Sequence, residues 1–467
     1  MEDGSNKVQL SVIKGDKLFN ENTPFVINVL YPESRFLNKK SDVDLICVID
    51  ISGSMAGTKI EMVKKSLIAL VEIMDENDRL ALILFNDESI KYFDFNYLTN
   101  GKKNFIKEKI KEINAGGGTN ILSGLKNAID ILVNDKIKKY NRSSSILLLS
   151  DGCDNNLDDV QLGQELKDLT KGKDLNFTLN TFGYGNDHDP KIMKKLASIR
   201  DGSFFYVDKY ENVAEFFGIC MGNCASVVAN KASLVIELLN KSCAIKKIFG
   251  EEYLYSHELK PHYFTTTMLH FISGKEFTYV LEFELILNNV KNGEDLLTVD
   301  FIYQNNENIF CRKSVTYKYK EKDKNCAKAN AEYIRCQVYS VIDNSIKLKE
   351  KGRNSEAKES LEEMKDWLTT NQKTENSLSR QSFLDDINDA LKICKKQQKI
   401  ETKEEAHTFN RVYENITKKQ SSERILYCTP SSEHYSSSSR DAFCRYNEKK
   451  SDLSNDEKKE KKKCSIF

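Results

Sequence analysis

Short apolar runs alternate with segments of helical spacing over the first half of the chain. The run DLICVID, residues 44–50, is followed by Ile60, Val63 and Leu67, which fall on one face of a helix. The next run, RLALILF at 79–85, is too short and too apolar to be anything but a buried strand. Because such strands are covered on both faces, the alternation predicts a doubly wound, mostly parallel α/β sheet.

The same alternation continues to about residue 230. The segments SILLLS (145–150) and NFTLNTFGYG (176–185) are typical of further buried strands. A helix over 213–228 is predicted to close the unit. We therefore expect an α/β domain over residues 41–230, with any ligand bound beyond the carboxyl ends of its strands.

The pattern changes after residue 230 to alternation with period two. Runs such as ASLVIELL (232–239) and LLTVDFIYQ (296–304) are rich in β-branched and aromatic residues, which predicts an antiparallel β-sandwich over 231–320. The opening segment, residues 1–40, is also strand-like and would be unstable alone. We expect it to complete the later sandwich, so that the α/β domain is an insertion.

The last third of the chain contains two further regions. Apolar residues return to helical spacing over 321–418, which predicts a small helical bundle. Residues 419–467 are polar, with four consecutive serines and a lysine-rich end, and are predicted to form a disordered tail.

Five oxygen-bearing residues predict a metal site at the carboxyl edge of the sheet. One loop carries Asp50, Ser52 and Ser54, Thr119 follows a run of glycines, and Asp151 follows the strand 145–150. A magnesium ion prefers about six oxygen donors in octahedral geometry, and hydroxyls and carboxylates supply them. We expect Mg²⁺, with Mn²⁺ or Ca²⁺ as alternatives.

These residues resemble the metal-ion-dependent adhesion site of the von Willebrand factor A family, in which Asp-x-Ser-x-Ser, Thr and Asp elements occur in this order. The resemblance implies that Ser52, Ser54 and Thr119 coordinate the ion directly, while Asp50 and Asp151 act largely through water. It also implies that the ion binds an Asp or Glu carboxylate of a partner protein.

Two other interpretations of this loop fail on particular residues. A phosphate-binding loop needs Gly-x-x-x-x-Gly-Lys-Ser/Thr, whereas residues 53–59 read GSMAGTK. A phosphotransferase with an Asp nucleophile at the strand end would need a second Asp at position 52, where this chain has serine. We therefore predict no catalytic residue and no enzyme activity.

The last four residues, CSIF, fit a C-a-a-X prenylation motif at Cys464, and the terminal Phe467 indicates geranylgeranyl. Five lysines between residues 458 and 463 precede the motif. A prenyl chain and a basic segment together can hold a protein at an anionic membrane surface. The expected location is the cytoplasmic face of a membrane.

Composition excludes several classes of protein. Lys plus Arg and Asp plus Glu both number 70, so no overall positive charge favours nucleic acid as a partner. No apolar stretch has the length of a signal peptide or membrane span. We expect the 12 cysteines to be reduced. Cys220 and Cys224, one helical turn apart, are expected to be core residues rather than zinc ligands.

Three functions remain open. The first is a membrane-anchored binding protein that captures a partner carboxylate at its metal site. The second is a non-catalytic subunit or substrate adaptor of a ubiquitin-ligase complex. The third is a structural scaffold in which the metal only stabilises the loops.

Overall fold

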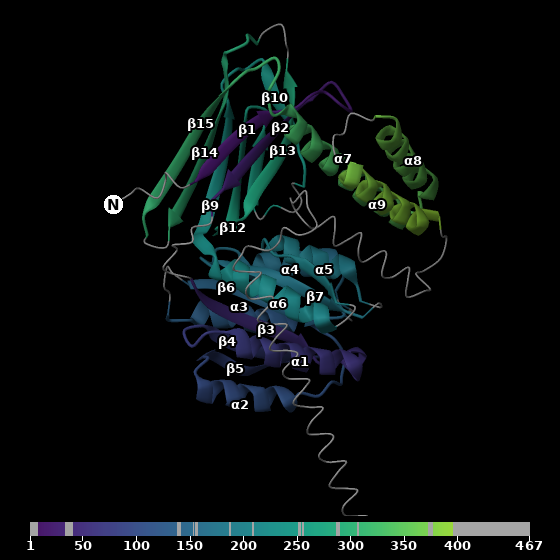
Figure 1. Cartoon of the computed structure of the whole chain (residues 1–467). Coiled ribbons are helices and arrows are strands. Elements are labelled where there is room, and N and C mark those ends of the chain that lie inside the picture. The colour runs from purple at the N-terminus through teal and green to yellow at the C-terminus, as the bar shows by residue number, and fades with distance from the viewer. Residues whose placement is uncertain are drawn as a thin grey trace, which may run out of the picture.

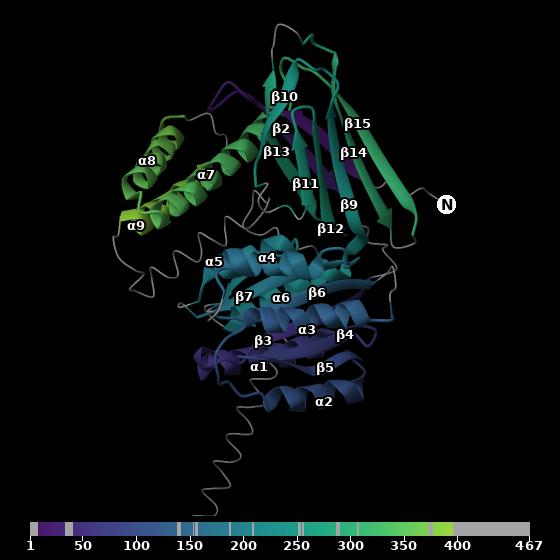
Figure 2. The same cartoon turned by 180° about the vertical axis from the view of Figure 1, so that it is seen from behind.

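The computed structural model describes residues 8–395, except for 33–40, 138–141, 153, 155–156, 186–187, 208–209, 251–253, 255, 286–289, 306–307 and 372–376. Three parts are visible in Figures 1 and 2: a β-sandwich, an α/β domain beside it and a group of helices at one side. The predicted prenylation motif and tail lie outside the described residues.

The α/β domain is built on a six-stranded sheet of order β5-β4-β3-β6-β7-β8, in which only β5 is antiparallel to its neighbour. This confirms the predicted doubly wound, mostly parallel sheet. Its strands are β3 (Asp42–Asp50), β4 (Arg79–Phe85), β5 (Ser89–Tyr97), β6 (Arg142–Ser150), β7 (Phe177–Tyr184) and β8 (Phe204–Val207).

Helices cover both faces of this sheet, because its strands are apolar on both sides. Ile46 and Val48 of β3 face one core with α3, α4 and α5, whereas Leu45 and Cys47 face the other with α1, α2 and α6. The helices are α1 (Thr58–Ile73), α2 (Asn100–Lys111), α3 (Ile121–Asn134), α4 (Asp159–Thr170), α5 (Pro190–Ile199) and α6 (Tyr210–Ala225).

Two features of this domain differ from the sequence prediction. The closing helix ends at Ala225 rather than at residue 228, and Val227 and Val228 already belong to the first strand of the sandwich. The edge strand β5 was not predicted, because its side chains are mostly half-exposed and form no continuous apolar run. Cys220 and Cys224 of α6 are both buried in the core between this helix and the sheet.

The β-sandwich consists of two antiparallel sheets, of orders β1-β2-β13-β10 and β11-β12-β9-β14-β15, around one apolar core. Strand β2 pairs with β13 from Phe283↔Thr23 to Glu276↔Leu30, so strands on either side of the α/β domain share a sheet. The strands are β1 (Gln9–Lys14), β2 (Thr23–Leu30), β9 (Val227–Leu238), β10 (Cys243–Ile248), β11 (Ser256–Lys260), β12 (Tyr263–Ile272), β13 (Glu276–Leu285), β14 (Asp295–Asn305) and β15 (Phe310–Lys318).

Three helices follow: α7 (Cys326–Glu350), α8 (Asn354–Thr370) and α9 (Ser377–Lys395). A buried ion pair between Lys194 of α5 and Asp343 of α7, 3.1 Å apart, joins them to the α/β domain. Trp367 lies against Phe19, with ring centroids 4.1 Å apart, and so joins α8 to the segment between β1 and β2. None of the described helices is long and apolar enough to span a membrane.

The buried His270 of β12 predicts that the protein loses stability in mild acid. Burial lowers the pKa of His270 from 6.5 to about 4, so the folded state resists protonation that the unfolded chain accepts. The contribution of His270 to the free energy of unfolding is fully present above pH 6.5. It falls by roughly 3 kcal/mol as the pH drops towards 4. Urea unfolding at several pH values should show a smaller loss in His270→Gln.

The matched control is His257→Gln, which changes an exposed histidine of β11. It should keep the full pH dependence of the wild type. Equal pH dependence in the two variants would contradict the role given to His270.

Candidate metal site

The carboxyl ends of two adjacent parallel strands bring the first site residues together. Strands β3 and β6 pair in register, with Ile49 opposite Leu149, so Asp50 and Ser150 end the two strands side by side. The Ser150 hydroxyl donates a hydrogen bond of 2.5 Å to Asp50 Oδ2. Asp50 is completely buried. Strand pairing by itself therefore places the Asp50 carboxylate beside Ser150.

The loop after β3 folds back over Asp50. The backbone N–H of Ser52 donates to Asp50 Oδ1 at 2.8 Å, and a short 3-10 turn over Gly53–Met55 follows. The Oγ atoms of Ser52 and Ser54 lie 3.0 Å apart, and Ser54 is exposed whereas Ser52 is buried. This turn places two of the predicted hydroxyl ligands next to each other at the edge of the sheet.

The glycine-rich segment before Thr119 lies against the same loop. Gly53 N–H donates to Gly117 O at 2.9 Å, and Gly116 N–H donates to Ile51 O at 2.6 Å. Gly117 has a φ of +93°, and a Cβ there would lie 2.8 Å from the Asn86 amide nitrogen. Glycine is thus required for the close approach that brings the chain to the buried Thr119.

The segment after β6 closes the site from the other side. Asp154 Oδ2 accepts a hydrogen bond of 2.7 Å from Ile121 N–H, which ties this segment to the start of α3, two residues after Thr119. The Asp151 carbonyl accepts from Asp189 N–H at 2.9 Å. The loops that carry all five predicted residues are therefore linked by hydrogen bonds or by adjacent strands.

Two buried carboxylates of like charge give the site its electrostatic character. Burial raises the pKa of Asp50 to about 6, and the charge of Asp151 adds to the rise, whereas hydrogen bonds from Ser150 and Ser52 oppose it. Lys59 of α1 supplies one positive charge, with its Nζ 3.1 Å from Asp151 Oδ2. Buried carboxylates beside hydroxyl groups are oxygen donors of the kind that a divalent cation prefers.

Sequence reasoning missed three residues that shape this site. Ser150 and Asp154 orient the loops, and Lys59 pairs with Asp151. The register of β3 and β6 would have revealed Ser150, because it ends the strand next to Asp50. The role of Lys59 depends on how α1 lies against the loop of β6, and no local sequence signal predicts that.

Comparison with known proteins decides the family of the α/β domain. Residues 44–218 match the model of the von Willebrand factor type A domain. The chain contains a von Willebrand factor type A domain. The solved structure of a von Willebrand factor type A protein from Catenulispora acidiphila has the same fold, with a TM-score of 0.62 and 15% identity over 87% of this chain and 96% of that one. The ArnB paralog VWA2 from Sulfolobus acidocaldarius superposes with a TM-score of 0.55 and 16% identity, covering 88% and 98% of the two chains.

Two sequence relatives each match less than half of this chain. An uncharacterized protein of Synechocystis is 29% identical over 201 residues, which are 43% of this chain and 46% of that protein. The human voltage-dependent calcium channel subunit alpha-2/delta-2 is 26% identical over 173 residues, 36% of this chain and 14% of the subunit. The match thus spans less than half the length of either relative.

The ion pair between Lys59 and Asp151 predicts competition with a metal ion. We expect Lys59→Met to bind Mg²⁺ about tenfold more tightly, because removing a nearby positive charge lowers the repulsion of the incoming cation. In chelator the variant should unfold at a lower temperature than the wild type. Its two buried carboxylates then have neither Mg²⁺ nor the Lys59 ammonium group beside them. Titration calorimetry and thermal unfolding measure the two effects.

Lys64→Met is the matched control, because Lys64 lies on the same helix but pairs with Glu61. Its affinity for Mg²⁺ should equal that of the wild type. Unchanged or weaker binding of Mg²⁺ by Lys59→Met would contradict the prediction.

Proposed function

We propose that this protein is a non-catalytic, metal-dependent binding protein that captures a carboxylate of a partner protein. In this proposal Ser52, Ser54 and Thr119 hold a Mg²⁺ ion directly, and Asp50 and Asp151 hold it largely through water. The bound ion would supply a positive centre for an anionic oxygen. The 3.0 Å approach of the two serine hydroxyls beside a buried carboxylate carries the proposal.

The hydrogen bonds of Asp50 support a division of roles within the site. Both oxygens of its carboxylate already accept a hydrogen bond, one from Ser52 N–H and one from the Ser150 hydroxyl. Neutral hydroxyls are therefore the better candidates for direct ligands, and a cage of neutral ligands leaves more of the positive charge to a partner. Ser54 is exposed and lies where a partner could approach.

The alternative function is a structural scaffold in which the metal ion only stabilises the loops, and one observation favours it. The charge of Asp151 disfavours ionisation of Asp50, and a cation bound between them would relieve that repulsion whether or not a partner exists. The two functions differ in what metal removal does. In the scaffold, chelation would lower stability with no effect on any partner, whereas in the binding protein it would abolish capture.

We expect Asp50→Asn to lose Mg²⁺ binding and partner capture while it keeps the fold. The asparagine oxygen can accept from Ser52 N–H, and the Ser150 hydroxyl can turn to accept from the amide, so each of the two hydrogen bonds of the carboxylate has a replacement. Calorimetry with Mg²⁺ measures the first loss. Affinity capture from a cell extract in Mg²⁺ and in chelator, with mass spectrometry, measures the second.

Asp130→Asn, an exposed change on α3, serves as the control and should behave like the wild type. If Asp50→Asn unfolds without a cooperative transition, or if chelator leaves the captured proteins unchanged, the scaffold explains the site and the binding function is wrong.

We further propose that the protein is held at the cytoplasmic face of a membrane by prenylation of Cys464. The support comes from the sequence alone, since the CSIF motif and the five lysines before it lie outside the described residues. One prenyl chain binds reversibly, and each well-placed lysine adds about 1 kcal/mol at an anionic surface. Asp456, Glu457 and Glu460 reduce this charge.

Cys464→Ser should move the protein from the membrane fraction to the soluble fraction. Serine cannot form the thioether, and the lysines alone should give only weak attraction that salt removes. Fractionation at low and high salt measures the distribution. Ser465→Ala keeps the cysteine and should stay on membranes. A soluble wild type, or a serine variant that stays bound at high salt, would contradict the anchor.

A further inference from the structure

The loops around the candidate metal site carry acidic side chains and no basic ones. These loops are residues 51–57, 86–88, 112–120, 151–158 and 185–189, and Lys and Arg are absent from all of them. Their described acidic residues are Asp87, Glu88, Glu112, Asp151, Asp154, Asp158 and Asp189. An anionic partner that approaches this edge of the sheet therefore meets negative charge around the site.

Most of these carboxylates have a favourable group of the protein beside them. Asp158 and Asp189 cap the amino ends of α4 and α5, where the helix dipole is positive. Asp151 and Glu112 pair with lysines, and Asp154 accepts two backbone hydrogen bonds. The two acidic residues of the loop between β4 and β5 differ from these five.

Asp87 and Glu88 form that loop together with Asn86. Both carboxylates are exposed, and neither forms an ion pair with any Lys, Arg or His in the part of the chain that the structure describes. The loop itself is held in place, since Asn86 Nδ2 donates to Gly116 O at 2.9 Å. The loop therefore presents two fixed negative charges to solvent.

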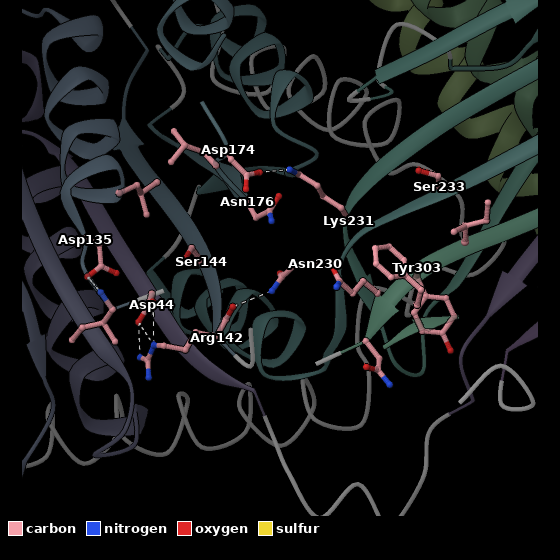
Figure 3. A pocket seen from close by; sticks show the side chains of 17 residues that line it. Asp44, Asp135, Arg142, Ser144, Asp174, Asn176, Asn230, Lys231, Ser233 and Tyr303 are labelled. Atoms are coloured by element: carbon pink, nitrogen blue, oxygen red, sulfur yellow. Dashed lines mark hydrogen bonds and ion pairs between the residues drawn. The ribbon is translucent and has the colours of Figure 1, made fainter. Parts of the chain in front are cut away.

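The opposite edge of the sheet treats its acidic side chains differently. Beside the sandwich, Arg142 pairs with Asp44, and Lys231 pairs with Asp174 (Figure 3). Arg142 also pairs with Asp42. Acidic groups at that edge are paired within the chain, whereas those of the loop between β4 and β5 are open to a cation from outside it.

Asp87 lies next to one of the predicted metal ligands. Its Oδ2 accepts a hydrogen bond of 2.7 Å from the N–H of Gly118, the residue before Thr119. A Cβ at Gly117 would lie 2.9 Å from the same oxygen, so glycine permits this contact. No side chain or N–H of the described residues donates to the other oxygen, Oδ1. Asp87 is thus fixed beside Thr119 with one oxygen open to a partner.

This placement determines what a metal-bound carboxylate must bring with it. Since consecutive Cα atoms are about 3.8 Å apart, a carboxylate bound at Thr119 would lie roughly 5–10 Å from Asp87. Like charges repel at that distance, because the screening length is about 8 Å at physiological ionic strength. A basic side chain one or two residues away would reverse the effect, since an extended segment advances about 3.3 Å per residue.

We propose that the partner's carboxylate has a lysine or arginine within two residues, and that this basic side chain pairs with Asp87. The carboxylate of the same segment binds the metal ion, and Glu88 adds to the attraction from the neighbouring position. This inference rests on the proposed metal-dependent binding function. It makes Asp87 a residue that determines specificity, distinct from the residues that hold the ion.

Selection from a random peptide library displayed on phage tests the proposal. The full chain is immobilised, clones bind in Mg²⁺ at low salt, and chelator elutes those that depend on the metal. Among clones from the wild type, Asp or Glu should have Lys or Arg within two residues far more often than in the starting library. With Asp87→Lys the neighbours should change to acidic and neutral residues, because the position then attracts the opposite charge.

Asp87→Asn separates the charge of this residue from its place in the loop. The asparagine oxygen can still accept from Gly118 N–H, so the loop before Thr119 keeps its support. The variant should still bind Mg²⁺ by calorimetry. It should bind a peptide selected on the wild type roughly fivefold more weakly at low salt, the upper value for one exposed ion pair, and the difference should shrink at high salt.

Asp130→Lys is the matched control for charge reversal. Asp130 is exposed on α3, about 15 Å along that helix from its N-cap, Asn120, and its variant should select the same neighbours as the wild type. If chelator elutes no clones from the wild type, the binding function fails and this inference with it. If metal-dependent clones lack the basic neighbour, or if Asp87→Lys leaves the neighbours unchanged, this inference alone is overturned.

Discussion

The parallel pairing of β3 with β6 is the constraint on which the candidate metal site depends. It places Asp50 beside Ser150 at a buried edge, with Asp151 next along the chain. Two carboxylates out of water repel each other, and the pKa of Asp50 is raised mainly by burial, with that repulsion as a small addition. A fold that keeps both must supply hydrogen bonds and positive charge, which explains why Ser52, Ser150 and Lys59 converge there.

The two ends of β3 handle buried negative charge in different ways. At its start, Asp44 is neutralised by the guanidinium groups of Arg79 and Arg142, which are themselves buried. At its end, the side chains around Asp50 and Asp151 include one ammonium group, from Lys59. The first arrangement needs no external ion. The second places two buried carboxylates beside hydroxyl groups, a combination of oxygen donors of the kind that divalent cations prefer.

Sequence patterns predicted the parts of the fold that local chemistry determines. Apolar runs identified β3, β4 and β6, and the spacing of Asp50, Ser52 and Ser54 identified the loop. These patterns did not predict β5, since an edge strand needs only one buried face. They also did not predict the end of α6, because Val227 and Val228 are as apolar as a helix core. Lys59 acquires its environment only from a contact distant in sequence, the ion pair with Asp151.

The way the domain is inserted determines which of its edges a large partner could reach. Ser41 N–H donates to Ala225 O, and its hydroxyl donates to Val227 O at 2.8 Å, so the chain enters and leaves the domain at one point. That point lies beside the start of β3, at the edge where Asn230 contacts Arg142. The sandwich therefore approaches the edge opposite the loops of the candidate metal site. Attachment at the starts of the strands is what leaves Ser54 exposed at their ends.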